Sequence, residues 1–163
     1  MKRFALLIAV LVPMLTQAQI QIERKSSVTM LAKTTNLVSE LFEVYAQPTD
    51  SAAIYIFSVQ TNNQFDDKML FPLGFSQQEA LTSLKQIRDL LDEKIGSRYE
   101  LPLLTGAATV KVAENGTALF PTKKNRTGLY VSGPGFAGAQ VITRKVMDTL
   151  IKQTEEYGKN AND

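Results

Sequence analysis

The chain has 163 residues, with 18 lysines and arginines against 16 aspartates and glutamates, and it contains no histidine, cysteine or tryptophan. The lack of histidine and cysteine excludes most zinc, copper and haem sites, and it also excludes Ser-His-Asp and Cys-His catalysis. Any enzymatic activity would depend on carboxylates, lysine, tyrosine, serine or threonine. The composition therefore favours a non-enzymatic protein.

The first 18 residues have the three parts of a secretory signal peptide. Lys2 and Arg3 give a positive start, residues 4–15 are apolar except for Pro13, and Ala18 ends a cleavage-like segment. A membrane span needs about 20 apolar residues, so we predict cleavage after Ala18 and no stable membrane anchor. The mature protein is then expected in the periplasm or outside the cell.

Removal of this segment leaves 145 residues, a length that suits one domain. We predict a single domain over residues 19–158 and a disordered tail over 159–163. Because two basic residues are lost with the leader, the mature chain has equal numbers of acidic and basic residues. A neutral chain has no overall electrostatic attraction to nucleic acid or to anionic lipid.

Residues 27–46 fit both a helix and a strand. The apolar residues with helical spacing are Leu31, Val38, Leu41 and Tyr45, and those that alternate are Phe42, Val44 and Ala46. We favour a helix over 27–45, because Pro48 would end it, and keep a strand as the alternative.

Two apolar runs follow, at residues 52–60 and 68–74. Both are rich in β-branched and aromatic residues, and the polar segment 61–67 joins them, which predicts a hairpin. The oxygen-bearing residues of this segment are Asn62, Asn63, Asp66 and Asp67. Their spacing is not that of an EF-hand, so we interpret the segment as a polar loop and predict no metal site.

The clearest helix signal is FSQQEALTSLKQIRDLLDEKIG. Ser76 and Glu79 have the spacing of a capping box, Phe75 is placed to act as a hydrophobic staple, and Gly96 is placed to end the helix. The apolar residues that repeat at helical spacing are Ala80, Leu84, Ile87, Leu91 and Ile95. This pattern predicts an amphipathic helix with one face in the core.

After this helix, Asn115-Gly116 lies between two alternating segments and predicts a hairpin with a type I′ turn. Residues 127–132 predict another strand, which follows a basic loop. A last helix is expected from near Ala137 to Gly158.

Strands and helices therefore come in blocks rather than in regular β-α-β alternation. This order predicts an α+β fold, with a mostly antiparallel sheet and two or three helices packed on one face in two layers. Strands followed by a helix, occurring twice, are similar in outline to PUR-type and whirly-type single-strand-binding folds. That resemblance implies nucleic-acid binding, but the neutral mature charge and the export signal make nucleic acid an unfavoured partner.

Residues 133–138, GPGFAG, match the letters of a dinucleotide-binding loop. That fingerprint requires a second parallel strand with an acidic residue after the helix, and the residues after Gly138 are all assigned to the last helix and its tail. Pro134 also lacks a backbone N–H group. We therefore predict no nucleotide cofactor, and no other cofactor, and interpret the segment as a flexible connection.

A weaker prediction concerns anions. The start of a helix attracts negative groups, and the basic loop before the strand at 127–132 can come close to it. The resulting candidate surface for an anion or a partner consists of Lys123, Lys124, Arg126, Tyr130, Phe136 and Gly138. A solvated basic loop is the alternative, and no catalytic residue is predicted.

The sequence as a whole predicts a small exported, non-enzymatic domain that binds a protein or glycan partner. One alternative is a hydrolase that uses carboxylates or tyrosine. A further alternative is a single-strand nucleic-acid-binding fold.

Overall fold

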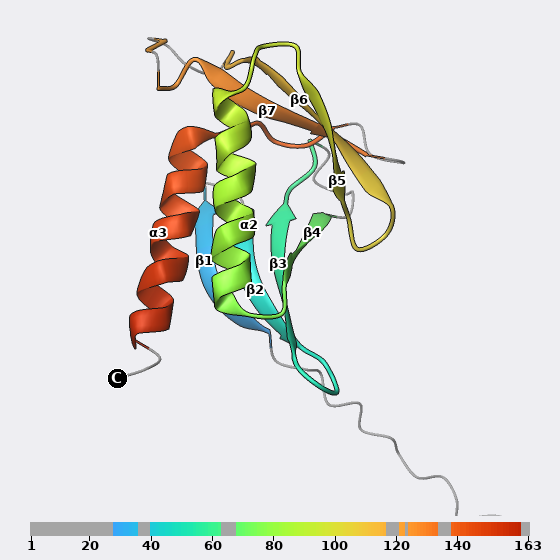
Figure 1. The fold of residues 1–163 in the computed structure, drawn as a ribbon, viewed down its shortest axis with the longest axis vertical. Coiled ribbons are helices and arrows are strands. Elements are labelled where there is room, and N and C mark those ends of the chain that lie inside the picture. Colours follow the sequence, from blue (N-terminus) through green and yellow to red (C-terminus); the bar gives the residue numbers. More distant parts are fainter. Residues whose placement is uncertain are drawn as a thin grey trace, which may run out of the picture.

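The structure is a computed structural model, and it describes residues 28–35, 40–62, 68–116, 121–122, 124–133 and 138–160. These residues form two antiparallel four-stranded sheets and two α-helices, so the fold is α+β as predicted. Each half of the chain contains four strands followed by one helix (Figure 1). The predicted two-layer arrangement of one sheet is not confirmed, because the strands divide between two sheets. The predicted signal peptide lies outside the described residues.

The first sheet has its strands in sequence order. They are β1 (Thr29–Thr35), β2 (Glu40–Pro48), β3 (Ala53–Val59) and β4 (Met69–Gly74). The helix favoured for residues 27–45 is therefore wrong, and the hairpin predicted from residues 52–60 and 68–74 is confirmed as β3 and β4. The strand pattern prevails because Phe42, Val44 and Ala46 all lie on one buried face, where β3 pairs with them.

The second sheet also has its strands in sequence order. They are β5 (Arg98–Pro102), β6 (Ala107–Glu114), β7 (Thr127–Ser132) and β8 (Ile142–Thr143). The predicted turn at Asn115-Gly116 is wrong: β6 pairs with β7, and Asn115 N–H donates to the carbonyl of Arg126 at 2.7 Å. A type I′ turn requires a positive φ at both central residues, and neither Asn115 nor Gly116 has one.

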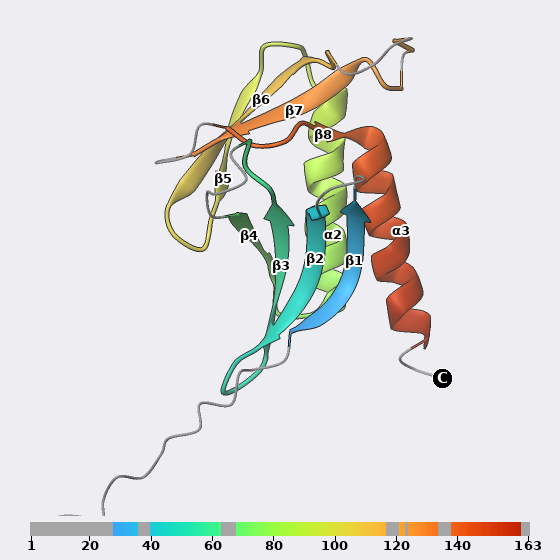
Figure 2. The ribbon, with the colours of Figure 1, turned by 180° about the vertical axis from the view of Figure 1, so that it is seen from behind.

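Two antiparallel helices cover one face of the first sheet (Figures 1 and 2). They are α2 (Gln77–Asp89), which continues into the 3₁₀ turn η1 (Leu90–Asp92), and α3 (Arg144–Asn160). Lys85 of α2 and Glu155 of α3 form an ion pair at 2.9 Å. Buried side chains of both sheets and both helices belong to one hydrophobic cluster. Within the described ranges, no helix is long and apolar enough to span a membrane.

The first helix is shorter than predicted. The spacing predicts a helix up to Gly96, whereas η1 ends at Asp92 and Glu93 is extended. Gly96 N–H donates to the carbonyl of Val112 at 2.8 Å, so the chain has already joined the second sheet there. Leu91 is the last buried residue before Gly96. The helix does not continue to Gly96, because the chain pairs with β6 from there onward.

The second helix begins later and ends later than predicted. It starts at Arg144 rather than near Ala137, because Ile142 pairs with Leu129 in the second sheet. It also continues past Gly158 to Asn160. Gly158 lies against the start of α2, where an added Cβ would clash with the side-chain amide of Gln77. This glycine therefore permits a close helix contact instead of ending the helix.

The start of α2 is capped as the sequence predicts, with one difference. Ser76 Oγ accepts the backbone N–H of Glu79 at 3.2 Å, and the Glu79 carboxylate accepts the N–H of Phe75, rather than that of Ser76, at 2.7 Å. The carboxylate lies against Gly74, whose φ of 128° and missing Cβ leave room for it. The predicted staple is wrong, because the Phe75 side chain is 67% exposed.

We expect Ser76→Ala to lower the free energy of unfolding by about 1 kcal/mol, because the N–H of Glu79 loses its acceptor. The melting temperature should fall by roughly 2–4 °C. Thr82→Ala is the matched control: it removes a hydroxyl that bonds back to the carbonyl of Gln78 on the exposed side of the same helix. Thermal unfolding of both variants measures the difference, and equal melting temperatures would contradict a role for the cap.

Candidate functional site

A wide groove of about 570 Å³ lies between the loop before β7 and the first turns of α3. We call it the basic groove. Its basic and acidic lining residues are Lys124, Arg144, Lys145, Lys152 and Asp148. Its uncharged polar lining residues are Asn115, Asn125, Thr143 and Thr149. The groove is therefore lined by four cations, one carboxylate, and several amides and hydroxyls.

The short strand β8 brings the two walls of the groove together. Gly128 of β7 pairs with Thr143 of β8, which places the loop that carries Lys124 beside the start of α3. Thr143 Oγ1 also lies 3.4 Å from the N–H of Val146, in the first turn of the helix. Along α3, residues 145, 149 and 152 are three or four positions apart and share one face.

Some of these charges are already neutralised. Arg144 Nη2 lies 2.5 Å from Asp92 Oδ1, and Lys152 Nζ lies 3.7 Å from Glu156 Oε1. Lys124 and Lys145 are exposed, and neither forms an ion pair with another residue of the described ranges. These two lysines, one from each wall, are therefore the cations that a ligand meets without a competing ion pair, and the exposed carboxylate of Asp148 lies in the same lining.

A cluster of opposite charges lies where α2 ends and α3 begins. The hydrogen bond to Asp89, and after it the charges of Asp89, Asp148 and Asp92, outweigh burial and raise the pKa of Arg88 above its ordinary value. In the same region, the Arg144 guanidinium donates a hydrogen bond to the Asp92 carboxylate. The carboxylates here therefore act on arginines that join the two helices, and they are not arranged as a free acidic pair.

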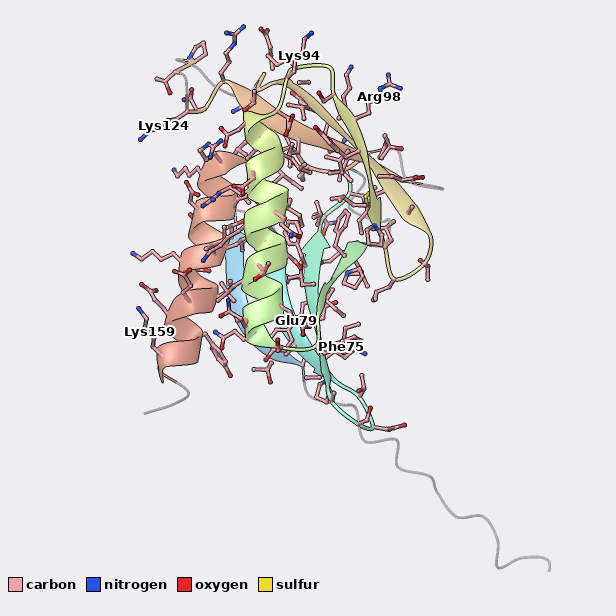
Figure 3. The ribbon with its side chains drawn as sticks, viewed as in Figure 1. Phe75, Glu79, Lys94, Arg98, Lys124 and Lys159 are labelled. Carbon is pink, nitrogen blue, oxygen red and sulfur yellow. The ribbon has the colours of Figure 1, made fainter. Side chains whose placement is uncertain are left out.

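The structure brings three of the predicted surface residues to one end of the second sheet. Lys124 lines the groove, and Figure 3 shows its side chain near the start of α3. Arg126 pairs with Glu114 at 3.4 Å, and the Tyr130 hydroxyl donates to the carbonyl of Glu114 at 3.0 Å. Arg126 and Tyr130 therefore hold the ends of β6 and β7 together beside the groove. Two predicted members, Lys123 and Phe136, lie outside the described residues.

Gly138, the remaining predicted member, is not brought to the groove. Its carbonyl accepts the N–H of Asn62 at 3.0 Å, and the N–H of the next residue, Ala139, donates to the carbonyl of Val131. Gly138 therefore lies at the end of β7 that is far from the basic groove. A strand of six residues spans about 17 Å, which is the approximate distance between the two ends. The separation arises because the helix begins at Arg144, six residues after Gly138.

Three cations of the groove, Arg144, Lys145 and Lys152, were missed by the sequence reasoning. Their spacing along one helix face is a readable signal, but only once the helix start is placed at Arg144. With the helix started near Ala137, these residues appear as an ordinary solvated face. The error in the helix start therefore conceals the site.

A second, apolar cavity of about 210 Å³ lies between β4, α2 and β5. Its walls are residues 71–73 of β4, one side of α2 and η1 with Ile87 and Leu90, and Leu101 and Pro102 of β5. A volume of this size holds a small aromatic or branched aliphatic group. We call it the apolar cavity.

Figure 2 shows the face of the first sheet that the helices leave uncovered. Glu43 alternates along β2 with the core residues Phe42 and Val44, so its side chain belongs to this face. Lys68 Nζ donates to Glu43 Oε2 at 2.5 Å, and Glu43 is almost fully buried. Tyr45 follows on the same side of β2. Burial, and to a smaller extent the charge of Glu43, raise the pKa of Tyr45 above its ordinary value of 10.0.

This shift predicts a loss of stability at alkaline pH. The unfolded chain ionises Tyr45 near its ordinary pKa, whereas the folded protein keeps it neutral to a higher pH, so stability present below pH 10.0 is lost above it. We expect Tyr45→Phe to reduce this decline. Chemical denaturation near neutral pH and above pH 10 measures this loss of stability in the unchanged protein and in Tyr45→Phe. An unchanged decline in Tyr45→Phe would assign the effect to other groups.

No protein-family model, curated protein or solved structure gives a significant match to this chain. Within the described ranges, no cluster of three or more acidic residues is placed to hold a metal ion. Function is therefore inferred from the two cavities and the charges around them.

Proposed function

We propose that this protein is a binding module that takes an anionic group of a protein or glycan partner into the basic groove. The observation that carries the proposal is the pair of exposed lysines, Lys124 and Lys145, which face one groove from two different elements without an ion-pair partner in the described ranges. The groove volume suits an extended acidic segment better than a single small ion.

The remaining lining supports the same kind of ligand. Asn115, Asn125 and Thr149 make this lining polar, although Asn115 Nδ2 already donates to the carbonyl of Asn125 and Thr149 Oγ1 to that of Lys145. The start of α3 adds the partial positive charge of a helix N-terminus. Carboxylate or sulfate groups carried on a hydroxyl-rich or amide-rich chain therefore match the chemistry of the groove.

The proposal includes export. Residues 1–18 are proposed to be a cleaved signal peptide, so that the domain reaches the periplasm or the outside of the cell. The charges and apolar run of that segment are its support. In this location the partners available to the groove are envelope proteins and acidic glycans.

A hydrolase based on paired carboxylates has less support. Such a reaction needs two carboxylates facing one cleft. Of the charged residues that line the basic groove, only Asp148 is acidic, and the described lining of the apolar cavity contains no acidic residue.

A second candidate function, single-strand nucleic-acid binding, has one specific observation in its favour. The element order of four strands and a helix, occurring twice, agrees with the outline that the sequence suggests for such folds. Aromatic rings that stack on bases are typical of these sites. None of the described lining residues of the basic groove is aromatic, so the groove favours a carboxylate- or sulfate-bearing partner.

The test is a binding titration of residues 19–163 with four polymers. They are polyglutamate, an acidic polysaccharide, a neutral polysaccharide and single-stranded DNA. We expect binding to the acidic protein or glycan chains, weaker at high salt because the contacts are exposed charges, and no binding to the neutral polymer. The absence of binding to every polyanion at low salt would overturn the proposal, and a clear preference for DNA would favour the second candidate.

A further inference from the structure

Strand β5 presents an unpaired edge. In an antiparallel pair, residues that bond to the neighbouring strand alternate with residues whose backbone groups point away. Ser97 accepts from Val112 and Leu103 donates to Gly106, so the odd-numbered residues bond toward β6. The N–H and C=O groups of Arg98 and Glu100 therefore point outward. No hydrogen bond to another described residue is found for them.

The edges of the first sheet differ from this one. At β1, the N–H of Lys33 donates to the Gln153 side chain of α3 at 2.9 Å. At β4, the carbonyl of Leu70 accepts the N–H of Leu104, and Pro72 has no N–H to offer. Such contacts are typical of edges protected against strand addition. Of these three edges, β5 is the one that offers two outward residues with both donor and acceptor groups, Arg98 and Glu100, before Pro102, which has no N–H.

The apolar cavity lies directly beside this edge. Leu101 and Pro102 of β5 form one wall, and Ile87 and Leu90 form part of the opposite wall. The N–H of Leu104, just after β5, donates to the carbonyl of Leu70 of β4, so a strand added to β5 would lie on the side of β4 and α2, next to the cavity. Backbone pairing with an edge strand, combined with a pocket for an alternate side chain, is a general mode of peptide recognition.

We propose that the β5 edge binds an extended peptide in antiparallel orientation, with one bulky apolar side chain in the apolar cavity. This site is separate from the basic groove and does not depend on it. Side chains alternate across a strand, so the peptide residue opposite Leu101 faces the cavity. The residues opposite Glu100 and Arg98 face the other side, where a basic and an acidic residue complement those charges.

The probe that follows is a labelled, capped peptide with the central sequence Phe-Lys-Val-Glu. In antiparallel register its Phe lies opposite Leu101, its Lys opposite Glu100 and its Glu opposite Arg98. The N–H groups of the Lys and the Glu then face β5, whereas the N–H of the Val faces away. We expect saturable binding by fluorescence polarisation.

Three altered peptides test the register without changing the protein. Methylation of the Lys backbone nitrogen should weaken binding roughly fivefold to tenfold, because one hydrogen bond to β5 is lost. Methylation of the Val nitrogen, the matched control, should have little effect. Replacement of the Phe by Ala should weaken binding by roughly tenfold or more, because the cavity is left unfilled.

Two protein variants test the edge itself. Glu100→Pro removes the outward N–H and leaves the bonds to β6 in place, and we expect it to weaken binding at least fivefold. Glu100→Ala removes the same side chain but keeps that N–H, and it should weaken binding less. Circular dichroism checks that both variants fold. If Glu100→Pro does not fold, the methylated peptides still test whether backbone hydrogen bonds to β5 contribute to binding.

Several results would overturn the proposal. They are the absence of peptide binding, equal effects of the two methylated peptides, and binding that survives loss of the Phe. Self-association of the protein that Glu100→Pro abolishes, without peptide binding, would instead assign the edge to a second copy of the chain. Sedimentation at several protein concentrations measures that outcome.

Discussion

Phe57→Ala is expected to lower the free energy of unfolding by about 3–5 kcal/mol, with a fall in melting temperature of the order of 10 °C. Phe57 is 0% exposed, and its ring centre lies 6.4 Å from that of Phe42 and 5.8 Å from that of Phe71. These three rings connect β2, β3 and β4 beneath the helices. Removing the central ring leaves a cavity that its rigid neighbours cannot fill.

Phe75→Ala is the matched control, because it removes the same side chain at a position that is 67% exposed. Figure 3 shows Phe75 just before the start of α2. It should change the free energy of unfolding by no more than about 0.5 kcal/mol. Urea unfolding of both variants at one temperature makes the comparison. Similar losses in the two variants would mean that the described core is wrong.

The double substitution Lys124→Glu and Lys145→Glu is expected to weaken binding of an acidic partner roughly thirtyfold. Each lysine contributes the modest attraction of an exposed ion pair, and reversal of its charge replaces that attraction by a repulsion of similar size. Because neither lysine forms an ion pair in the described ranges, the folded state should lose little stability. Binding titrations at low salt, with melting curves alongside, measure both effects.

The double substitution Lys94→Glu and Lys159→Glu changes the net charge by the same amount. Both lysines are exposed. Lys159 lies at the C-terminal end of α3, whereas Lys124 lies near the start of this helix (Figure 3). We expect this control to retain most of the binding, with only the small loss that overall charge produces. Equal losses in the two double variants would show that net charge, rather than the basic groove, determines binding.

The two sites respond to these tests independently. The lysine substitutions lie on the β7 loop and α3, whereas Glu100→Pro lies on β5. Peptide binding that persists in the Lys124 and Lys145 variant would show that the β5 edge acts without the basic groove. Failure of one proposal therefore leaves the other to be judged on its own result.

Local signals were sufficient for several elements. The hairpin of β3 and β4 and the cap at Ser76 depend on neighbours within a few residues, and both are present in the structure. The α+β class follows from the same local patterns. The excluded chemistries depend only on composition, and the lack of histidine and cysteine holds for any fold of this chain.

The remaining features depend on contacts between distant segments. Residues 27–46 carry both periodicities, and pairing of β2 with β3 selects the strand. Asn115-Gly116 has the residues of a tight turn, but pairing of β6 with β7 imposes a longer connection. Pairing of β8 with β7 delays the start of α3 to Arg144.

The same physical reason accounts for the two proposed sites. The groove forms because β8 brings Lys124 to Lys145, and the open edge exists because β5, which no local pattern predicts, ends the second sheet. By itself, the sequence determined the available chemistry, the fold class and the locally encoded elements, since these depend on composition and short-range periodicity. Only the tertiary structure decided which strands pair, where α3 begins and which charges face one groove, because long-range pairing overrides local preference.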